Sequence, residues 1–377
     1  MRHPAGSGFP LPTIAGVRVL IAPDKFAGTM SAADAAAAMA RGWVGQRRGD
    51  DVVCRPMADG GEGTIDVVAA GAGGRRRRLP VADARGYAVT AEWLRLPDGR
   101  ALIESAQACG LHLVPADQRD PRLTTTFGVG QLIRAAAAEG AHEIIVGLGG
   151  SATVDGGAGM ATALGHRLLR EDGNGVKVGG GFLTALHRVV PVPAPDVPVV
   201  VAVDVHGPLL GPDGAVAGFA AQKGAGPDAL PVLETSLRTL ADVTERDVDG
   251  GPWRDLPGAG AAGGLGFGLA AFAGGRLVSG APLVAELVRL AEAAAVADVV
   301  VTGEGRLDRW SLRGKVPGEV CDHARRHGAR AVAIVGSAAD DVAGAFDAVE
   351  ELGEAGLRDP VGTVEAGAAA LAAAITG

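Results

Sequence analysis

The sequence predicts an α/β protein with one parallel-sheet domain built from both ends of the chain and a mixed α+β domain inserted between them. Two patterns support this fold class. Short apolar runs alternate with helical stretches near both termini, which is typical of a parallel sheet. The middle of the chain instead contains alternating runs joined by tight turns, which indicate antiparallel hairpins. The composition, 47% hydrophobic and 21% charged, suits such a globular chain.

The N-terminal part contains two strand–loop–helix units. Residues 17–22 form a short apolar, β-branched run, and an alanine-rich stretch at 31–46 follows with helical spacing. Residues 52–57 form the next apolar run, and a helical pattern follows at 64–71. We therefore expect two strands, each followed by a helix.

The C-terminal part repeats this pattern, whereas the middle does not. Residues 298–302 and 331–335 are buried-strand runs separated by a helical segment at 316–327. In the middle, alternating runs surround a Pro-Asp-Gly turn at 97–99. These alternating runs are 76–81, 87–96 and 100–105, further strand-to-loop units lie at 143–148 and 198–203, and glycine- or proline-rich spacers lie at 179–197 and 249–264.

These elements define the expected domains. Residues 1–16 are a flexible extension, residues 17–80 and 286–377 form the discontinuous α/β domain, and residues 81–285 form the inserted domain. A chain of 377 residues is long enough for about two domains with sizeable cores.

Composition excludes several classes of function. The formal charge of -8 and an aromatic content of 3% argue against nucleic-acid binding, which uses basic surfaces and stacking platforms. The arginines at 75–78 are interpreted as a solvated strand end. Cys54, Cys109 and Cys321 lack the spacing of a disulfide framework or a zinc site. A small-molecule ligand is the expected partner.

The expected compartment is the cytoplasm. Residues 1–16 lack the apolar block of a signal peptide. No uninterrupted apolar run reaches about 18 residues, so neither a spanning helix nor a membrane partner is expected. A homodimer stays possible.

Acidic residues follow five of the apolar runs. In open parallel sheets, ligands bind at the carboxyl ends of the strands, so acids gathered there suggest a cation site. The alternative is that aspartate and glycine simply suit turns and helix caps. The acids are Asp24, Asp59, Glu62, Asp155, Asp204, Glu304 and Asp308.

A glycine-rich run at 147–159 predicts a phosphate cradle. Its backbone N–H groups can converge on an anion, and Ser151 and Thr153 add hydroxyl groups. Its first six residues also match the G-x-G-x-x-A pattern of a dinucleotide fold. We discount that alternative because Asp155 and the glycines after it interrupt the place where the helix should begin.

The segment 302–315 predicts phosphoryl transfer without a P-loop, since no G-x-x-x-x-G-K-[ST] occurs in the chain. It combines two acids with hydroxyl groups and several cations after a buried strand, as such chemistry requires. A salt-bridged surface turn is the alternative. Lysine is scarce, and three of the four lysines lie in the glycine-rich loops: Lys25, Lys223 and Lys315.

At these residues the sequence resembles the glycerate kinase family, specifically the class that makes 2-phosphoglycerate without a Walker motif. The resemblance extends over nearly the whole chain from Val17. The motifs that carry it are Ala22–Phe26, Met57–Thr64, Thr124–Gly128, Gly149–Ala152 with Asp155–Gly159, Gln222–Gly224, Pro257–Gly266, Thr302–Asp308 and Leu312–Lys315.

The resemblance implies a flavodoxin-like domain from the two chain ends, an inserted domain, and an active site in the cleft. It also implies ATP-dependent phosphorylation of D-glycerate to 2-phospho-D-glycerate with ATP and Mg²⁺. The hypothetical roles are Asp155 or Asp308 as base with Lys315 at the transferred phosphate; Lys25, Asp59, Glu62, Arg306 and Ser311 at the substrate; Gly149, Gly150, Ser151, Gly156, Gly157 and Lys223 at ATP; and Asp204 and Glu304 at the metal.

The chain departs from the family pattern at four positions. These are polar-to-apolar or polar-to-small changes near the expected cleft, namely Ala27, Val154, Gly207 and Trp310. Two alternatives therefore stay open: a kinase of another short hydroxy acid, and a non-catalytic sensor of a carboxylate or nucleotide. The retained acids and lysines speak against the sensor, which needs no complete set of metal ligands and base.

Overall fold

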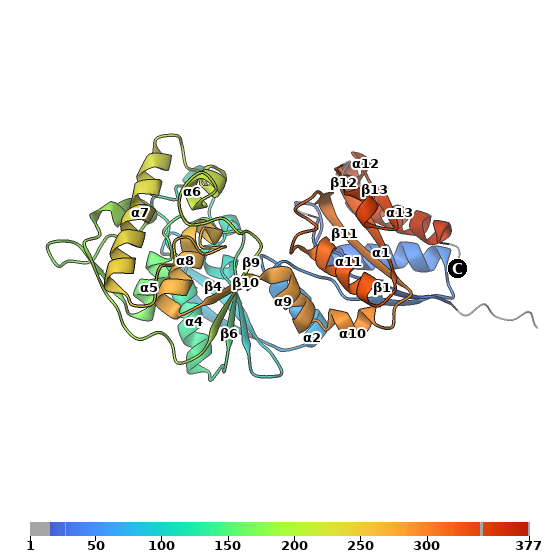
Figure 1. The fold of residues 1–377 in the computed structure, drawn as a ribbon, viewed down its shortest axis with the longest axis horizontal. Helices are drawn as coiled ribbons and strands as arrows, with labels where there is room; N and C mark the ends of the chain where they lie inside the picture. Colours follow the sequence, from blue (N-terminus) through green and yellow to red (C-terminus); the bar gives the residue numbers. More distant parts are fainter. Residues whose placement is uncertain (1–15, 27, 340–341, 376–377) are drawn as a thin grey trace, which may run out of the picture.

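The computed structural model describes residues 16–26, 28–339 and 342–375, and it contains two main sheets in two lobes (Figure 1). The first sheet is parallel throughout and has the order β13-β12-β11-β1-β2. Its strands are β1 (Arg18–Ile21), β2 (Asp51–Cys54), β11 (Val299–Leu307), β12 (Arg330–Ala338) and β13 (Ala348–Glu351). Both chain ends thus contribute to one sheet, and the strand order from β2 to β13 is the 2-1-3-4-5 order of flavodoxin.

Helices cover both faces of this sheet. Along β1, Val19 and Ile21 belong to a hydrophobic cluster with α1 (Ala32–Gln46) and α13 (Pro360–Ala374). Leu20, which points to the opposite face, belongs to a cluster with α11 (Val316–Arg326) and with two further helices, α2 (Thr64–Ala72) and α9 (Gly280–Leu287). This alternation follows from the period of two in a strand. Ser31 caps α1 by accepting a hydrogen bond from the Asp34 N–H.

The second sheet is mixed and has the order β10-β9-β6-β5-β4-β3. Its antiparallel part is the predicted pair of hairpins, and its parallel part joins β5, β6, β9 and β10. Four helices pack on one face: α4 (Phe127–Ala138), α5 (Ala158–Leu164), α7 (Ala229–Asp247) and α8 (Ala261–Ala273). The strands are β3 (Arg75–Ala82), β4 (Ala88–Arg95), β5 (Ala101–Glu104), β6 (Ile144–Gly147), β9 (Val199–Val203) and β10 (Arg276–Ser279).

The remaining elements are short. A two-stranded antiparallel sheet joins β7 (Arg167–Leu169) and β8 (Arg188–Val190), inside a region predicted in part as a spacer. The short helices are α3 (Ala106–Cys109), α6 (Ala215–Phe219), α10 (Leu290–Ala294), α12 (Ala355–Arg358) and 3-10 turns at Leu111–Leu113, Ala116–Gln118, Gly180–Ala185, Ala221–Lys223 and Ala343–Ala345.

The two sheets share one hydrophobic cluster. Leu102 and Val200 of the second sheet lie in the same cluster as Leu20 of the first, with α2 and α9 between the lobes (Figure 1). The domain division stays a prediction. However, the whole of β3 belongs to the second sheet, so a boundary that follows the sheets lies before residue 75 rather than near 80. Likewise, a boundary near 285 falls inside α9.

None of the helices in the described part of the chain is long and apolar enough to cross a membrane.

Candidate active site

Four acids lie where strands of the two sheets end. Asp24 and Asp59 lie in the loops after β1 and β2, Glu304 lies in the last half of β11, and Asp204 directly follows β9 of the second sheet. Because β1 and β11 are neighbours whose connections run to opposite sides of the sheet, the gap between their carboxyl ends is the switch point at which such sheets bind ligands. The sequence prediction that acids gather at strand ends is therefore confirmed for these four.

The cluster also includes Lys25 and Lys315. The Nζ atom of Lys25 lies 3.7 Å from Asp59 Oδ1 and donates a hydrogen bond of 3.2 Å to the Glu62 carbonyl. Burial lowers the pKa of Lys25, but nearby carboxylates, Asp59 first, outweigh this effect and raise it above its ordinary value. Lys25 is therefore held in its charged form.

Burial and repulsion by neighbouring carboxylates raise the pKa values of Asp24, Asp204 and Glu304. Burial, followed by the charge of Asp59, raises the pKa of Asp24 to about 8. Burial raises the pKa of Glu304 to about 7, and the charge of Lys315 opposes the rise. Burial and Asp59 also raise the pKa of Asp204 against the charges of Lys315 and Lys25. The site thus has excess negative charge that a bound cation would relieve.

The donor set is suited to a magnesium ion that is shared with a phosphate. Within the described residues, no three His, Cys, Asp or Glu side chains form a group that could hold a metal by themselves. Mg²⁺ usually binds one or two carboxylates, substrate phosphates and waters, so a closed protein cage is not required. The Oε1 atom of Glu304 is buried without a hydrogen-bond partner, which leaves it free to accept a ligand.

Glycines let the loop after β2 enter between the two sheets. A side chain at Gly147, at the end of β6, would meet the Gly60 carbonyl at 2.0 Å, and one at Gly149 would meet the Gly61 Cα at 2.8 Å. A side chain at Gly280 would meet the Asp59 carbonyl at 1.8 Å. Gly60 also has φ of 92°, which favours glycine. These close contacts fix Asp59 between the lobes.

Asp155 lies apart from this cluster and holds backbone in place. Its buried carboxylate accepts hydrogen bonds from the Thr126 N–H and hydroxyl, and from the N–H groups of Gly157 and Gly159 at 3.0 and 3.1 Å. These bonds join the start of α4 to the start of α5. Because both oxygens of the Asp155 carboxylate already accept hydrogen bonds from the protein, a structural role is favoured. The base role of Asp155 has no support in its contacts and stays only a prediction.

The other residues predicted to bind ATP also have structural partners. The buried Lys223 Nζ donates to Ser151 Oγ and to the Thr153 carbonyl, both at 2.8 Å. Burial lowers the pKa of Lys223 to about 8. A side chain at Gly156 would meet Leu240, and one at Gly157 would meet the Gly268 Cα at 2.8 Å. Their ATP-binding roles stay untested predictions, as do those of Gly149 and Gly150 beside Glu62.

The segment after β11 forms a turn beside Glu304. Asp308 Oδ1 accepts hydrogen bonds from the N–H groups of Trp310 and Ser311, and the Ser311 hydroxyl accepts one from the Asp308 N–H. Asp308 itself is half-buried, and its charge contributes to the raised pKa of Glu304. Arg306 is exposed and Lys315 directly precedes α11. Of the two predicted bases, the structure therefore brings only Asp308 to the acid cluster.

The structure distinguishes the four departures from the family pattern. Val154 is fully buried in the core of the second lobe, and a side chain at Gly207 would meet the Asp213 carbonyl. Trp310 is 54% exposed, with the guanidinium groups of Arg309 and Arg313 at 5.0 and 5.9 Å from its ring. Ala27 lies outside the described residues. Only Trp310 is thus seen in the loop beside the acid cluster.

Two cavities meet at Asp24 and Lys25. One, of about 700 Å³, extends along β11 and β12 toward α12 and α13, and the other, of about 780 Å³, extends toward α2 and His112. His112 Nδ1 lies 3.7 Å from Glu62 Oε1. Sequence reasoning missed His112 and the residues around α12, because an isolated histidine and scattered leucines form no motif. The one usable signal is the Gly336-Ser337 pair, which follows the apolar run 331–335 in the sequence.

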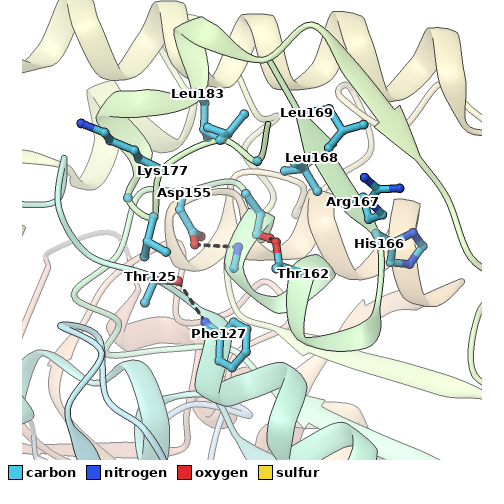
Figure 2. Close-up of a pocket in the computed structure, with 16 residues that line it drawn as sticks. Thr125, Phe127, Asp155, Thr162, His166, Arg167, Leu168, Leu169, Lys177 and Leu183 are labelled. Carbon is cyan, nitrogen blue, oxygen red and sulfur yellow. Dashed lines mark hydrogen bonds between the residues drawn. The ribbon is translucent and has the colours of Figure 1, made fainter. Parts of the chain in front are cut away.

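A third cavity, of about 280 Å³, lies on the other side of Asp155 (Figure 2). It is lined mainly by apolar groups such as Leu168 and Leu183, and the Asp155 carboxylate reaches its edge while bonded to the backbone of α5. The acid cluster does not contribute to its lining.

Together, the flavodoxin strand order and the charged cluster at its switch point define an α/β protein with a candidate ligand site at the carboxyl ends of its parallel strands. Comparison with known proteins narrows this class. The chain matches the family model described as "Glycerate kinase family" over residues 19–357. The chain therefore belongs to the glycerate kinase family, which confirms the resemblance inferred from its motifs and the expected kinase class.

Individual relatives agree with this assignment. The chain is 43% identical over 330 residues to a glycerate kinase of Bacillus subtilis (strain 168), covering 86% of each chain. It is 41% identical over 335 residues to glycerate 2-kinase of Escherichia coli (strain K12), covering 86% of this chain and 87% of the relative. A crystal structure of a protein assigned as glycerate kinase 2 from Salmonella typhimurium LT2 has a TM-score of 0.82 and 38% identity, covering 95% of this chain and 98% of that one.

Proposed function

We propose that this chain transfers the γ-phosphate of ATP to D-glycerate and forms 2-phospho-D-glycerate and ADP. The observation that carries the proposal is the cluster of Asp24, Asp59, Asp204 and Glu304 with two lysines, at the switch point of a flavodoxin-like sheet. Family membership and the E. coli glycerate 2-kinase support the acceptor and the position.

In the transfer, the hydroxyl oxygen of glycerate forms a bond to the γ-phosphorus while the bond between that phosphorus and the bridging oxygen of ADP breaks. The hydroxyl proton passes to a base, and we assign this role to Asp308 because its carboxylate lies beside Glu304 and is half-buried. Such reactions depend mainly on positioning and charge stabilisation. Lys25 and Lys315 are the cations that the cluster offers to the phosphates.

Magnesium is part of this proposal. Glu304, whose Oε1 atom lacks a partner, and Asp204 are the residues that would hold it together with phosphate oxygens. When bound, the ion would neutralise negative charge on the phosphates. A cytoplasmic location and a homodimer remain predictions of the sequence alone.

A panel of acceptors tests the proposal. ADP release is measured with MgATP and D-glycerate, L-glycerate, lactate, glycolate or tartrate, because exposed Trp310 differs from the family pattern beside the site. We expect D-glycerate to have the highest kcat/KM. A higher value for another acid would contradict the assigned acceptor, and ATP binding without turnover of any acid would favour a sensor.

A further inference from the structure

The cavity of about 700 Å³ has two ends of different chemistry. At one end lie charged groups of the acid cluster, including Asp24, Lys25, Glu304 and Arg306. The other end is formed after β13 and by the helices that follow. Its apolar lining residues are Leu352, Leu357, Pro360 and Val364. A ligand that fills this cavity must therefore have a charged part and an apolar part.

The position of the cavity favours a nucleotide. It lies over the carboxyl ends of β1, β11 and β12, which is where flavodoxin-like sheets bind their ligands. Its volume is within the range of about 300–1,000 Å³ typical of sites for organic ligands and cofactors. Glycerate alone has only three carbon atoms and no apolar face, so it cannot account for the apolar end.

The charges in the lining fix the orientation of the ligand. Lys25 and Arg306 are the cations among the residues that line this cavity, and both lie at the β1–β11 end. The residue with a charge at the far end is Glu354, which pairs with Arg358 at 3.3 Å. No cation is among the described residues that line the far end, so a triphosphate finds its positively charged partners only toward Lys25 and Arg306. A cation bound with the phosphates would offset the carboxylates at that end, and the uncharged part of the ligand then lies toward α12.

The far end also has the surfaces that a planar base requires. Leu357, on α12, is 74% exposed although it borders the cavity, so it has an apolar surface left to cover. Val364 of α13 is fully buried and forms part of the lining. The loop between β13 and α12 is held by the Gly353 N–H, which donates to the Gly336 carbonyl at 3.0 Å. Ser337 adds a hydroxyl to the lining.

We propose that this cavity binds the adenosine part of ATP, with the base against Leu357 and the triphosphate directed toward Lys25 and Arg306. The proposal rests on the function proposed above and names the nucleotide subsite for it. It also differs from the sequence expectation, in which the glycine-rich loop at 149–157 and Lys223 bind ATP. The acceptor would then approach from the second cavity, on the other side of Lys25.

Leu357→Glu tests the proposal, because a side chain this exposed can be replaced without disturbing the core. The matched control is Val361→Glu, since Val361 is 44% exposed, lies four residues further along, and does not line the cavity. Calorimetry would give Kd for MgADP, and for inorganic tripolyphosphate with Mg²⁺ as a probe without a base. Steady-state assays would give KM for ATP and for D-glycerate.

We expect Leu357→Glu to raise Kd for MgADP and KM for ATP by about tenfold or more, through loss of apolar contact. Tripolyphosphate binding, the KM for glycerate and all constants of Val361→Glu should stay within about twofold. Unchanged nucleotide affinity in Leu357→Glu, or an equal loss for tripolyphosphate, would overturn the subsite while leaving the kinase assignment intact. A wild-type protein that binds no nucleotide would overturn the proposed function itself.

Discussion

Replacing Asp155 with asparagine tests whether this residue is a loop anchor or the catalytic base. The carboxylate accepts from four donors, namely the N–H and hydroxyl of Thr126 and the N–H groups of Gly157 and Gly159. Oδ2 accepts the Thr126 N–H and the Gly159 N–H, whereas Oδ1 accepts the Gly157 N–H. The least harmful orientation of asparagine therefore places its NH₂ group at the Oδ1 position.

In that orientation the Gly157 N–H faces another donor and loses its partner. A buried donor left without a partner costs about 1–3 kcal/mol, and the remaining hydrogen bonds weaken because the acceptor is no longer charged. We therefore expect Asp155→Asn to reduce the free energy of unfolding by about 2–4 kcal/mol. The folded fraction at low temperature should keep a kcat within about threefold of wild type.

Asp308→Asn is the matched comparison. Its amide oxygen can still accept from the N–H groups of Trp310 and Ser311, so the free energy of unfolding should fall by less than about 1 kcal/mol. Because Asp308→Asn removes the proposed base, it should reduce kcat by about 10²–10⁴-fold. Urea denaturation and ADP-release assays on both variants measure the two quantities. The opposite pattern, with Asp155→Asn stable but inactive, would refute the assignment of both residues.

Three further results are expected. Gly280→Ala should reduce kcat at least tenfold, because its Cβ would lie 1.8 Å from the Asp59 carbonyl, whereas Gly218→Ala, with open space around its Cβ, should not. Burial lowers the pKa of Lys223 to about 8, below its ordinary value of about 10.5 in the unfolded chain. The free energy of unfolding should therefore rise by up to about 3 kcal/mol from this group as pH increases from about 8 to 10.5. Urea titrations should show this rise in the wild type and not in Lys223→Met. Glu304 has a pKa of about 7, so it should release up to about half a proton when MgADP binds at pH 7. The calorimetric enthalpy should therefore depend on the ionisation enthalpy of the buffer, and this dependence should be smaller in Glu304→Gln. Equal dependence in the two proteins would contradict the role of Glu304.

The sequence pattern predicts the acid cluster well, because each acid follows an apolar strand run. Asp24, Asp59, Asp204 and Glu304 meet since the carboxyl ends of parallel strands share an edge. The same pattern includes Asp155, which follows β6, but cannot reveal the Thr126 hydrogen bonds that occupy its carboxylate. That contact joins residues 29 positions apart, and its existence depends on how α4 and α5 pack.

The proposed nucleotide subsite could not be predicted from the sequence for a different reason. Leu352 and Leu357 resemble ordinary core residues, and only the fold shows that Leu357 is exposed beside a cavity. The sequence pattern places Gly147 and Gly149 in a predicted phosphate cradle, whereas in the fold both must be glycine because the Gly60–Gly61 backbone approaches them closely. Spacing along the chain cannot distinguish these two demands on a glycine.

The most direct test of the central claim is phosphorus NMR of the product formed from D-glycerate and MgATP, recorded alongside ADP release. The account predicts one mole of 2-phospho-D-glycerate for each mole of ADP. A signal from 3-phosphoglycerate would contradict the assigned position, and free phosphate formed at the same rate without any phosphoglycerate would contradict the transfer itself.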